Sequence, residues 1–147
     1  MMDTIKILDH KNTVIVAHRG LSGLERENTC AAFVAAGNRS YFGVETDVRK
    51  TIDGNFVLCH DDHTERNCVD KLFPEVSTLR ALQSLRYKDI DGSFDRYDLM
   101  MPTLQEYIKI PVMEEENIRI SLYRSGEKQA SRRGMGSGEG DCYHGEI

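Results

Sequence analysis

The sequence contains no tryptophan, only three prolines and no long apolar run. A membrane-spanning helix needs roughly 18 or more consecutive apolar residues, so we expect no membrane span. Positive charge is not in excess either, because the formal net charge is −5. Non-specific nucleic-acid binding depends on a basic stripe or patch. We therefore expect no nucleic-acid partner.

Cysteine is scarce and shows no metal-binding or disulfide pattern. Cys30, Cys59, Cys68 and Cys142 have no C-x-x-C spacing, and the N-terminal segment lacks the apolar core of a signal peptide. We expect reduced thiols and a cytoplasmic location. Cys59 alternates with apolar strand residues, so we expect it to act as a small buried hydrophobe.

The chain is as long as one ordinary domain, 147 residues, and it alternates strand and helix patterns. We expect a strand over 13–20, two strands over 41–51 and 56–61 around an Asp-Gly turn, and a third helix near 103–110. The first two helices should begin at Asn28 or Thr29 and at Ser77 or Thr78. The order β-α-β-β-α-α predicts an α/β fold.

Beyond residue 110 the character of the sequence changes. Residues 111–147 hold six of the twelve glycines and end without a clear period. The stretch 117–123 alternates apolar and polar residues as a strand does. We expect a partial domain over 1–110 and a divergent, partly disordered tail over 111–147.

The strand around "GVETDV" carries two acids on one face. Side chains alternate along a strand, so Glu45 and Asp47 face one way. Two neighbouring carboxylates repel unless a positive group lies between them, and Mg²⁺ or Ca²⁺ is suited to oxygen ligands. An alternative interpretation is an edge strand, which inward charges protect from aggregation.

Two other expected strands end in residues suited to chemistry. His18-Arg19 follows the first, and His60-Asp61 follows the third. In α/β proteins the carboxyl ends of the strands form the rim of the active site. Arginine binds phosphate oxygens, and two histidines can serve as general acid and base. Each residue alone is commonly structural, and His63 is interpreted as part of a polar loop, but together they predict metal-assisted phosphoryl-ester hydrolysis.

The segments "AHRG", "ENT", "GVETDVRKTIDGNFVLCHDD" and "MPTLQEY", together with Arg66, resemble the glycerophosphodiester phosphodiesterase family over about residues 13–109. The resemblance implies a metal-dependent TIM barrel that releases glycerol 3-phosphate and an alcohol from glycerophosphodiesters of lipid metabolism. Carried over by position, it implies metal ligands at Glu45 and Asp47, an acid/base pair of His18 and His60, a phosphate contact at Arg19 and a supporting role for Glu27.

The chain also departs from this family. Arg26 stands where proline is usual, and Arg119 or Ser121 stands where a third acidic ligand is expected. A TIM barrel typically needs about 250 residues, so we expect the N-terminal portion of a truncated barrel. Its open edge predicts self-association, and a reading-frame shift near Ile110 would explain the tail. The alternatives are an inactive fragment and a module that binds a phosphate or glycerophosphoryl group.

Overall fold

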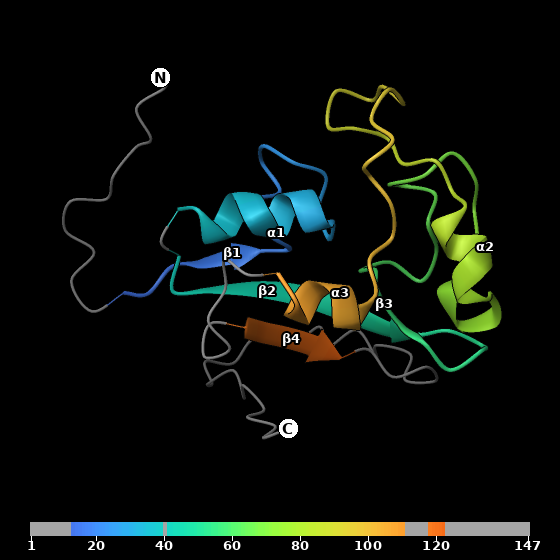
Figure 1. Ribbon diagram of the computed structural model, residues 1–147, viewed down its shortest axis with the longest axis horizontal. Coiled ribbons are helices and arrows are strands. Elements are labelled where there is room, and N and C mark those ends of the chain that lie inside the picture. Colours follow the sequence, from blue (N-terminus) through green and yellow to red (C-terminus); the bar gives the residue numbers. More distant parts are fainter. Residues whose placement is uncertain (1–12, 40, 111–117, 123–147) are drawn as a thin grey trace, which may run out of the picture.

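The computed structural model describes residues 13–39 and 41–110, together with the backbone of the strand at 118–122. The expected order β-α-β-β-α-α is confirmed, with a short 3₁₀ helix before the second α-helix and a further strand after the third (Figure 1). The elements are β1 (Val16–His18), α1 (Cys30–Gly37), β2 (Gly43–Lys50), β3 (Phe56–Leu58), η1 (Pro74–Val76), α2 (Leu79–Gln83), α3 (Leu104–Ile108) and β4 (Ile118–Leu122).

Strand β2 is the centre of the sheet. It pairs in parallel with β1 and β4 and antiparallel with β3. The interpretation of β2 as an edge strand, with its acids placed there to prevent aggregation, is therefore wrong. Glu45 and Asp47 lie on a strand that is hydrogen-bonded to three others, so their charges need partners within the fold.

The N-cap of helix α1 is Thr29, the second of the two expected capping residues. The Thr29 hydroxyl accepts a 3.3 Å hydrogen bond from the backbone N–H of Ala32. The buried face of α1 packs with α3 onto the apolar face of β1 and β2, as the ribbon shows (Figure 1). The main members of this core are Ala17, Phe33, Ala36, Val44, Val48, Tyr107 and Ile110.

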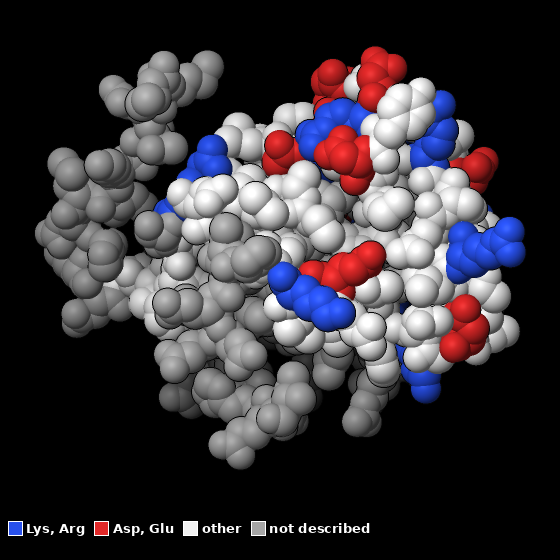
Figure 2. Space-filling model, in the orientation of Figure 1, with Lys and Arg blue, Asp and Glu red and all other residues white. Residues whose placement is uncertain are grey.

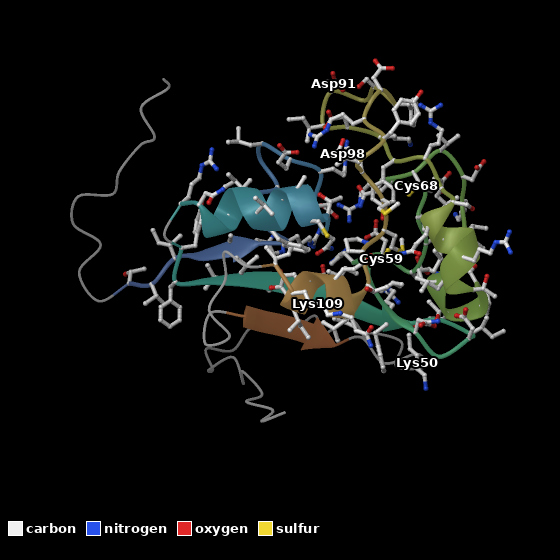
Figure 3. The ribbon with its side chains drawn as sticks, in the orientation of Figure 1. Lys50, Cys59, Cys68, Asp91, Asp98 and Lys109 are labelled. Atoms are coloured by element: carbon white, nitrogen blue, oxygen red, sulfur yellow. The ribbon has the colours of Figure 1, made fainter. Side chains whose placement is uncertain are left out.

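A second apolar cluster lies between β3 and α2, where Figure 3 labels Cys59 and Cys68. Cys59 is 6% exposed, which confirms it as a small buried residue, and burial raises the pKa of its thiol to about 12. Helix α2 has Thr78 as its cap, the second of the two expected residues, and is only five residues long. Ser84 ends it, because its hydroxyl bonds the carbonyl of Ala81 and competes with continuation of the helix. Leu85 remains buried although it lies after the helix.

In the part of the chain that the structure describes, no helix is long and apolar enough to cross a membrane. On the face shown in Figure 2, acidic and basic side chains lie interspersed over the upper and right-hand parts of the molecule.

Candidate active site

The first two strands bring His18 and Glu45 side by side. In the parallel register His18 of β1 is the partner of Glu45 of β2. His18 Nε2 lies 3.9 Å from Glu45 Oε2, and the His18 side chain is 67% exposed. A histidine at the surface, next to a carboxylate at the carboxyl end of its strand, is accessible to a substrate from solvent.

His60 also lies in this region, but the direction of the strand before it differs from the one expected. The prediction that β3 ends at the same carboxyl rim as β1 and β2 is wrong, because β3 runs antiparallel to β2. Strand β2 extends beyond β1, and the hairpin folds β3 back along this extension. The Cys59 N–H then donates a 3.0 Å hydrogen bond to the Asp47 carbonyl, which places His60 near the acid pair.

Arg19 lies among three carboxylates. Its backbone N–H donates to Glu45 Oε2 at 3.2 Å, and its Nη1 donates to both oxygens of Glu27 at 3.2 and 3.3 Å. Its Nε lies 3.2 Å from Asp47 Oδ2. The guanidinium thus supplies positive charge next to the buried Asp47 carboxylate, which is 2% exposed.

The contact between Arg19 Nε and Asp47 is chiefly a charge attraction. This nitrogen is buried and makes no directed hydrogen bond to any described residue. Its N–H is therefore a donor without a well-placed acceptor. A phosphate oxygen is the kind of acceptor that a guanidinium binds best.

Two non-glycine residues adopt left-handed backbone conformations beside this site. Arg19 has φ 57° and Asn28 has φ 53°, and the Asn28 N–H donates to the Arg19 carbonyl at 3.0 Å. Such conformations cost of order 1 kcal/mol or more each, and they cluster at functional sites. Next to them Gly20 has φ 81°, and a Cβ there would lie 2.7 Å from Ala32, so only glycine fits.

The Asn28 side chain contacts two buried residues of β2. Its Nδ2 donates to Asp47 Oδ2 at 3.1 Å, and its Oδ1 accepts from the Thr46 hydroxyl at 2.8 Å. Sequence reasoning treated Asn28 only as a candidate helix cap and missed this role. The available signal was an asparagine one residue before the cap, because asparagine is enriched at positive φ.

Arg49 holds the backbone around His60 through hydrogen bonds to two carbonyls. Its Nε and Nη2 donate to the carbonyls of Cys59 at 3.2 Å and His60 at 2.7 Å, and its Nη1 pairs with Glu75 at 3.2 Å. Arg49 is 9% exposed. Sequence reasoning missed Arg49, although an arginine two residues after Asp47 on a buried strand was the available signal.

A chain of ion pairs connects His60 with Arg19. His60 Nδ1 lies 2.7 Å from Asp61 Oδ1, and Arg66 Nε donates to Asp61 Oδ2 at 2.6 Å. Arg66 also pairs with Glu27, whose partner on the other side is Arg19. Glu27, for which the resemblance implied a supporting role, has a side chain that is 13% exposed and pairs with both arginines.

The acids of this site are of the type that binds a hard divalent cation. Glu27, Glu45 and Asp47 offer only oxygen ligands, and all three lie next to Arg19, Glu27 and Asp47 at its guanidinium and Glu45 at its backbone N–H. The donor chemistry fits Mg²⁺ or Ca²⁺. Among the described residues, however, no group of three or more His, Cys, Asp or Glu side chains is arranged to hold a metal ion.

Strand β4 brings no carboxylate to this position. Its register with β2 places Arg119 opposite Glu45 and Ser121 opposite Asp47. These are the two residues that the sequence offered in place of a third acidic ligand.

Comparison with known proteins agrees with this geometry. Residues 18–136 match the model of the glycerophosphoryl diester phosphodiesterase family, and the match continues past Ile110. A curated glycerophosphodiester phosphodiesterase from Caldanaerobacter subterraneus subsp. tengcongensis is 38% identical over 73 residues. That alignment covers 50% of this chain and 30% of the relative.

Solved structures show the same similarity. A phosphodiesterase from Oleispira antarctica, solved in complex with the product sn-glycerol-3-phosphate, is 30% identical with a TM-score of 0.63, covering 75% of this chain and 43% of that one. A glycerophosphodiester phosphodiesterase from Thermotoga maritima is 31% identical with a TM-score of 0.62, covering 78% and 46%. The neighbours are TIM barrels, and this fold corresponds to part of one. The chain spans less than half the length of each of these relatives.

Proposed function

Because this chain belongs to the glycerophosphoryl diester phosphodiesterase family, we propose that it hydrolyses glycerophosphodiesters to glycerol 3-phosphate and an alcohol in a metal-dependent reaction. One observation carries the proposal. The guanidinium of Arg19 lies against Glu27 and Asp47, its backbone N–H bonds Glu45, and His18 lies 3.9 Å from Glu45.

In this proposal Arg19 contacts a phosphate oxygen of the substrate through its guanidinium. One of His18 and His60 accepts the proton of the attacking water while the new O–P bond forms. The other donates a proton to the alcohol oxygen as the P–O bond to it breaks. Either histidine can take either part.

The proposed metal ligands are Glu45 and Asp47, with Glu27 in support. A divalent cation bound there would supply positive charge to stabilise the phosphoryl oxygens. Asn28 donates to Asp47 Oδ2, the same oxygen that lies next to Arg19 Nε, and so helps to hold this carboxylate in place. The oxygen-only donor set supports both Mg²⁺ and Ca²⁺.

The test is release of glycerol 3-phosphate from glycerophosphocholine by the purified chain, with and without Mg²⁺ or Ca²⁺. Glu45→Gln keeps the shape of the side chain and should abolish metal-dependent release. Glu65→Gln is the matched control, because Glu65 is exposed and pairs with Lys71 away from the acid pair. Equal rates for the wild type and Glu45→Gln would contradict the proposal.

A catalytically inactive fragment is the second candidate, and β4 favours it. Arg119 and Ser121 occupy the register positions beside Glu45 and Asp47, where the sequence offered no third acidic ligand. This candidate predicts no turnover at any concentration of Mg²⁺, Mn²⁺ or Ca²⁺. Calorimetry with glycerol 3-phosphate would then distinguish an inert chain from a phosphate-binding module.

We also propose that 1–110 is a partial domain and that a frame shift near Ile110 produced the tail, most of which lies outside the described residues. Two observations argue against the shift, namely the family match as far as residue 136 and the pairing of β4 with β2. Sequencing the gene tests it directly. Barrel sequence in another downstream frame would support the shift, and its absence would reject it.

Self-association is part of the proposal as well. Val14, Ile15, Val16 and Phe42 are 36–56% exposed beside β1. In a complete barrel a further strand would pair with this edge. We propose that copies of the chain associate through this edge. We also propose a cytoplasmic location, which the free thiols of Cys30, Cys59 and Cys68 support. Sedimentation showing a monomer at all concentrations would contradict the association.

A further inference from the structure

The ring of His60 is fixed by a carboxylate on its Nδ1 side. His60 Nδ1 and Asp61 Oδ1 are 2.7 Å apart, and the two side chains are 33% and 27% exposed. A carboxylate accepts but does not donate, so the ring nitrogen that faces it carries the proton. Neutral His60 then has its lone pair on Nε2.

The other oxygen of Asp61 is held by Arg66. Arg66 Nε donates to Asp61 Oδ2 at 2.6 Å. The two terminal nitrogens of the same guanidinium pair with Glu27, with Arg66 Nη1 3.0 Å from Glu27 Oε2 and Arg66 Nη2 2.7 Å from Glu27 Oε1. A planar guanidinium can bridge two carboxylates in this way, whereas a lysine ammonium, a single point charge, cannot reproduce the geometry.

We propose that Asp61 and Arg66 are positioning residues that keep neutral His60 in the Nδ1–H tautomer and tie its ring to Glu27. The effect on turnover rests on the proposed function, but the tautomer itself does not. The assignment goes beyond the roles of His60 and Glu27, because neither Asp61 nor Arg66 touches the phosphate or the reacting water in it.

Stability alone does not account for this arrangement. Partly exposed ion pairs contribute little to stability, so the series of four side chains from His60 through Asp61 and Arg66 to Glu27 adds little to the fold. Burial opposes ionisation of Asp61, but hydrogen bonds from His60 and Arg66 outweigh it and lower the pKa of Asp61. Both Asp61 oxygens are thereby engaged, which leaves this carboxylate a poor candidate for a metal ligand.

The decisive experiment reads the tautomer rather than activity. Nitrogen-15 NMR of the full chain labelled in its five histidines gives the protonation of each ring nitrogen, and the His60 signals are identified by their loss in His60→Gln. In the wild type above pH 8 we expect Nδ1–H to dominate. In Asp61→Asn the side-chain amide can donate to Nδ1, so we expect the Nε2–H form to rise severalfold.

Asp62→Asn is the matched control, because Asp62 is 74% exposed and its oxygen lies 3.8 Å from His63 rather than against His60. It should leave the His60 tautomer unchanged. A wild-type His60 that is mainly Nε2–H, or an Asp61→Asn spectrum identical to that of Asp62→Asn, would overturn the proposal. Thermal melting of each variant confirms that folded protein is being compared.

Arg66 is tested by two substitutions. Arg66→Gln removes the positive charge, whereas Arg66→Lys keeps it. Neither new side chain bridges Asp61 and Glu27, so we expect both variants to lower the Nδ1–H fraction of neutral His60. In an active chain we expect kcat to fall roughly 10²-fold with KM changed less than about twofold. Arg80→Lys, on the exposed side of α2, is the control. If the wild type shows no turnover, the proposed function fails, while the tautomer still decides this inference.

Discussion

Asn28 donates a 3.1 Å hydrogen bond from Nδ2 to Oδ2 of Asp47, across a buried contact between the loop before α1 and the centre of β2. The other end of the same amide accepts from the Thr46 hydroxyl. One side chain therefore satisfies a buried acid and a buried hydroxyl while its own backbone stays left-handed.

Asn28→Ala should destabilise the chain by about 2–4 kcal/mol, because it strands two buried polar groups and keeps an unfavourable backbone conformation. Asn28→Gly should cost about 1 kcal/mol less, since glycine relieves the left-handed strain. Asn28→Asp should be at least as harmful as Ala near pH 7, because it places a second carboxylate against Asp47. Urea titration of the three variants measures these differences. Equal stability of the Gly and Ala variants would show that the backbone is not strained.

Tyr107 offers a prediction about the apolar core. Its hydroxyl donates to the Val44 carbonyl at 3.0 Å, and its ring lies 4.4 Å from that of Phe33. Tyr107→Phe keeps the ring but leaves the carbonyl without this donor, which should cost about 1–2 kcal/mol. Tyr97→Phe is the matched control, because Tyr97 is 82% exposed and should change stability by less than about 0.5 kcal/mol. Equal effects in the two variants, measured by denaturant unfolding, would contradict the importance of this bond.

Alanine substitutions at three glycines compare the cost of a strained backbone with the cost of a steric clash. Gly23→Ala should be nearly neutral, because Gly23 has open space and no positive φ. Gly54→Ala should cost about 1–2 kcal/mol, because Gly54 has φ 84° but no neighbour within 4 Å. Gly20→Ala should cost clearly more, because the new Cβ would lie 2.7 Å from the backbone of Ala32 and α1 would have to shift. Thermal unfolding that ranks Gly54→Ala as the most damaging would show that the close contact at Gly20 relaxes at little cost.

These results show which features were local enough to predict. The shared face of Glu45 and Asp47 follows from the alternation of strand side chains, and the caps at Thr29 and Thr78 follow from their own neighbourhoods. The direction of β3 was not used to place His60. An Asp-Gly hairpin makes its strands antiparallel, so the carboxyl end of β3 could not share the rim of a parallel strand.

Contacts between distant segments were beyond the sequence. Arg66 and Glu27 are separated by 39 positions, and no spacing rule links them. Arg19 was expected to bind phosphate, yet nothing local showed that its guanidinium would also meet Glu27 and Asp47. Such pairings arise only when the tertiary fold brings loops together, and a single sequence does not encode them in any short pattern.

Arg49 gives a prediction for the support of His60. Arg49→Gln should destabilise the chain by about 2–3 kcal/mol, because it leaves the carbonyls of Cys59 and His60 and the Glu75 carboxylate without their donor. Arg80→Gln, a substitution of an exposed arginine, should have little effect. Denaturant unfolding compares the two. A loss below about 0.5 kcal/mol in Arg49→Gln would mean that water replaces its hydrogen bonds.

Asp61 makes stability depend on acid pH in a defined direction. Hydrogen bonds from His60 and Arg66 outweigh burial and lower its folded pKa below the unfolded value of about 3.9. A lowered folded pKa means that the ionised group stabilises the fold above about pH 4, and that this contribution is lost as pH falls toward the folded pKa. Asp61→Asn should therefore be about 0.5–1 kcal/mol less stable than the wild type at pH 6, with the gap closing below pH 4. Urea unfolding from pH 3 to 6 measures it, with Asp62→Asn as the control for removing one charge. A gap that stays constant over this range would show that Asp61 acts by its shape rather than its charge.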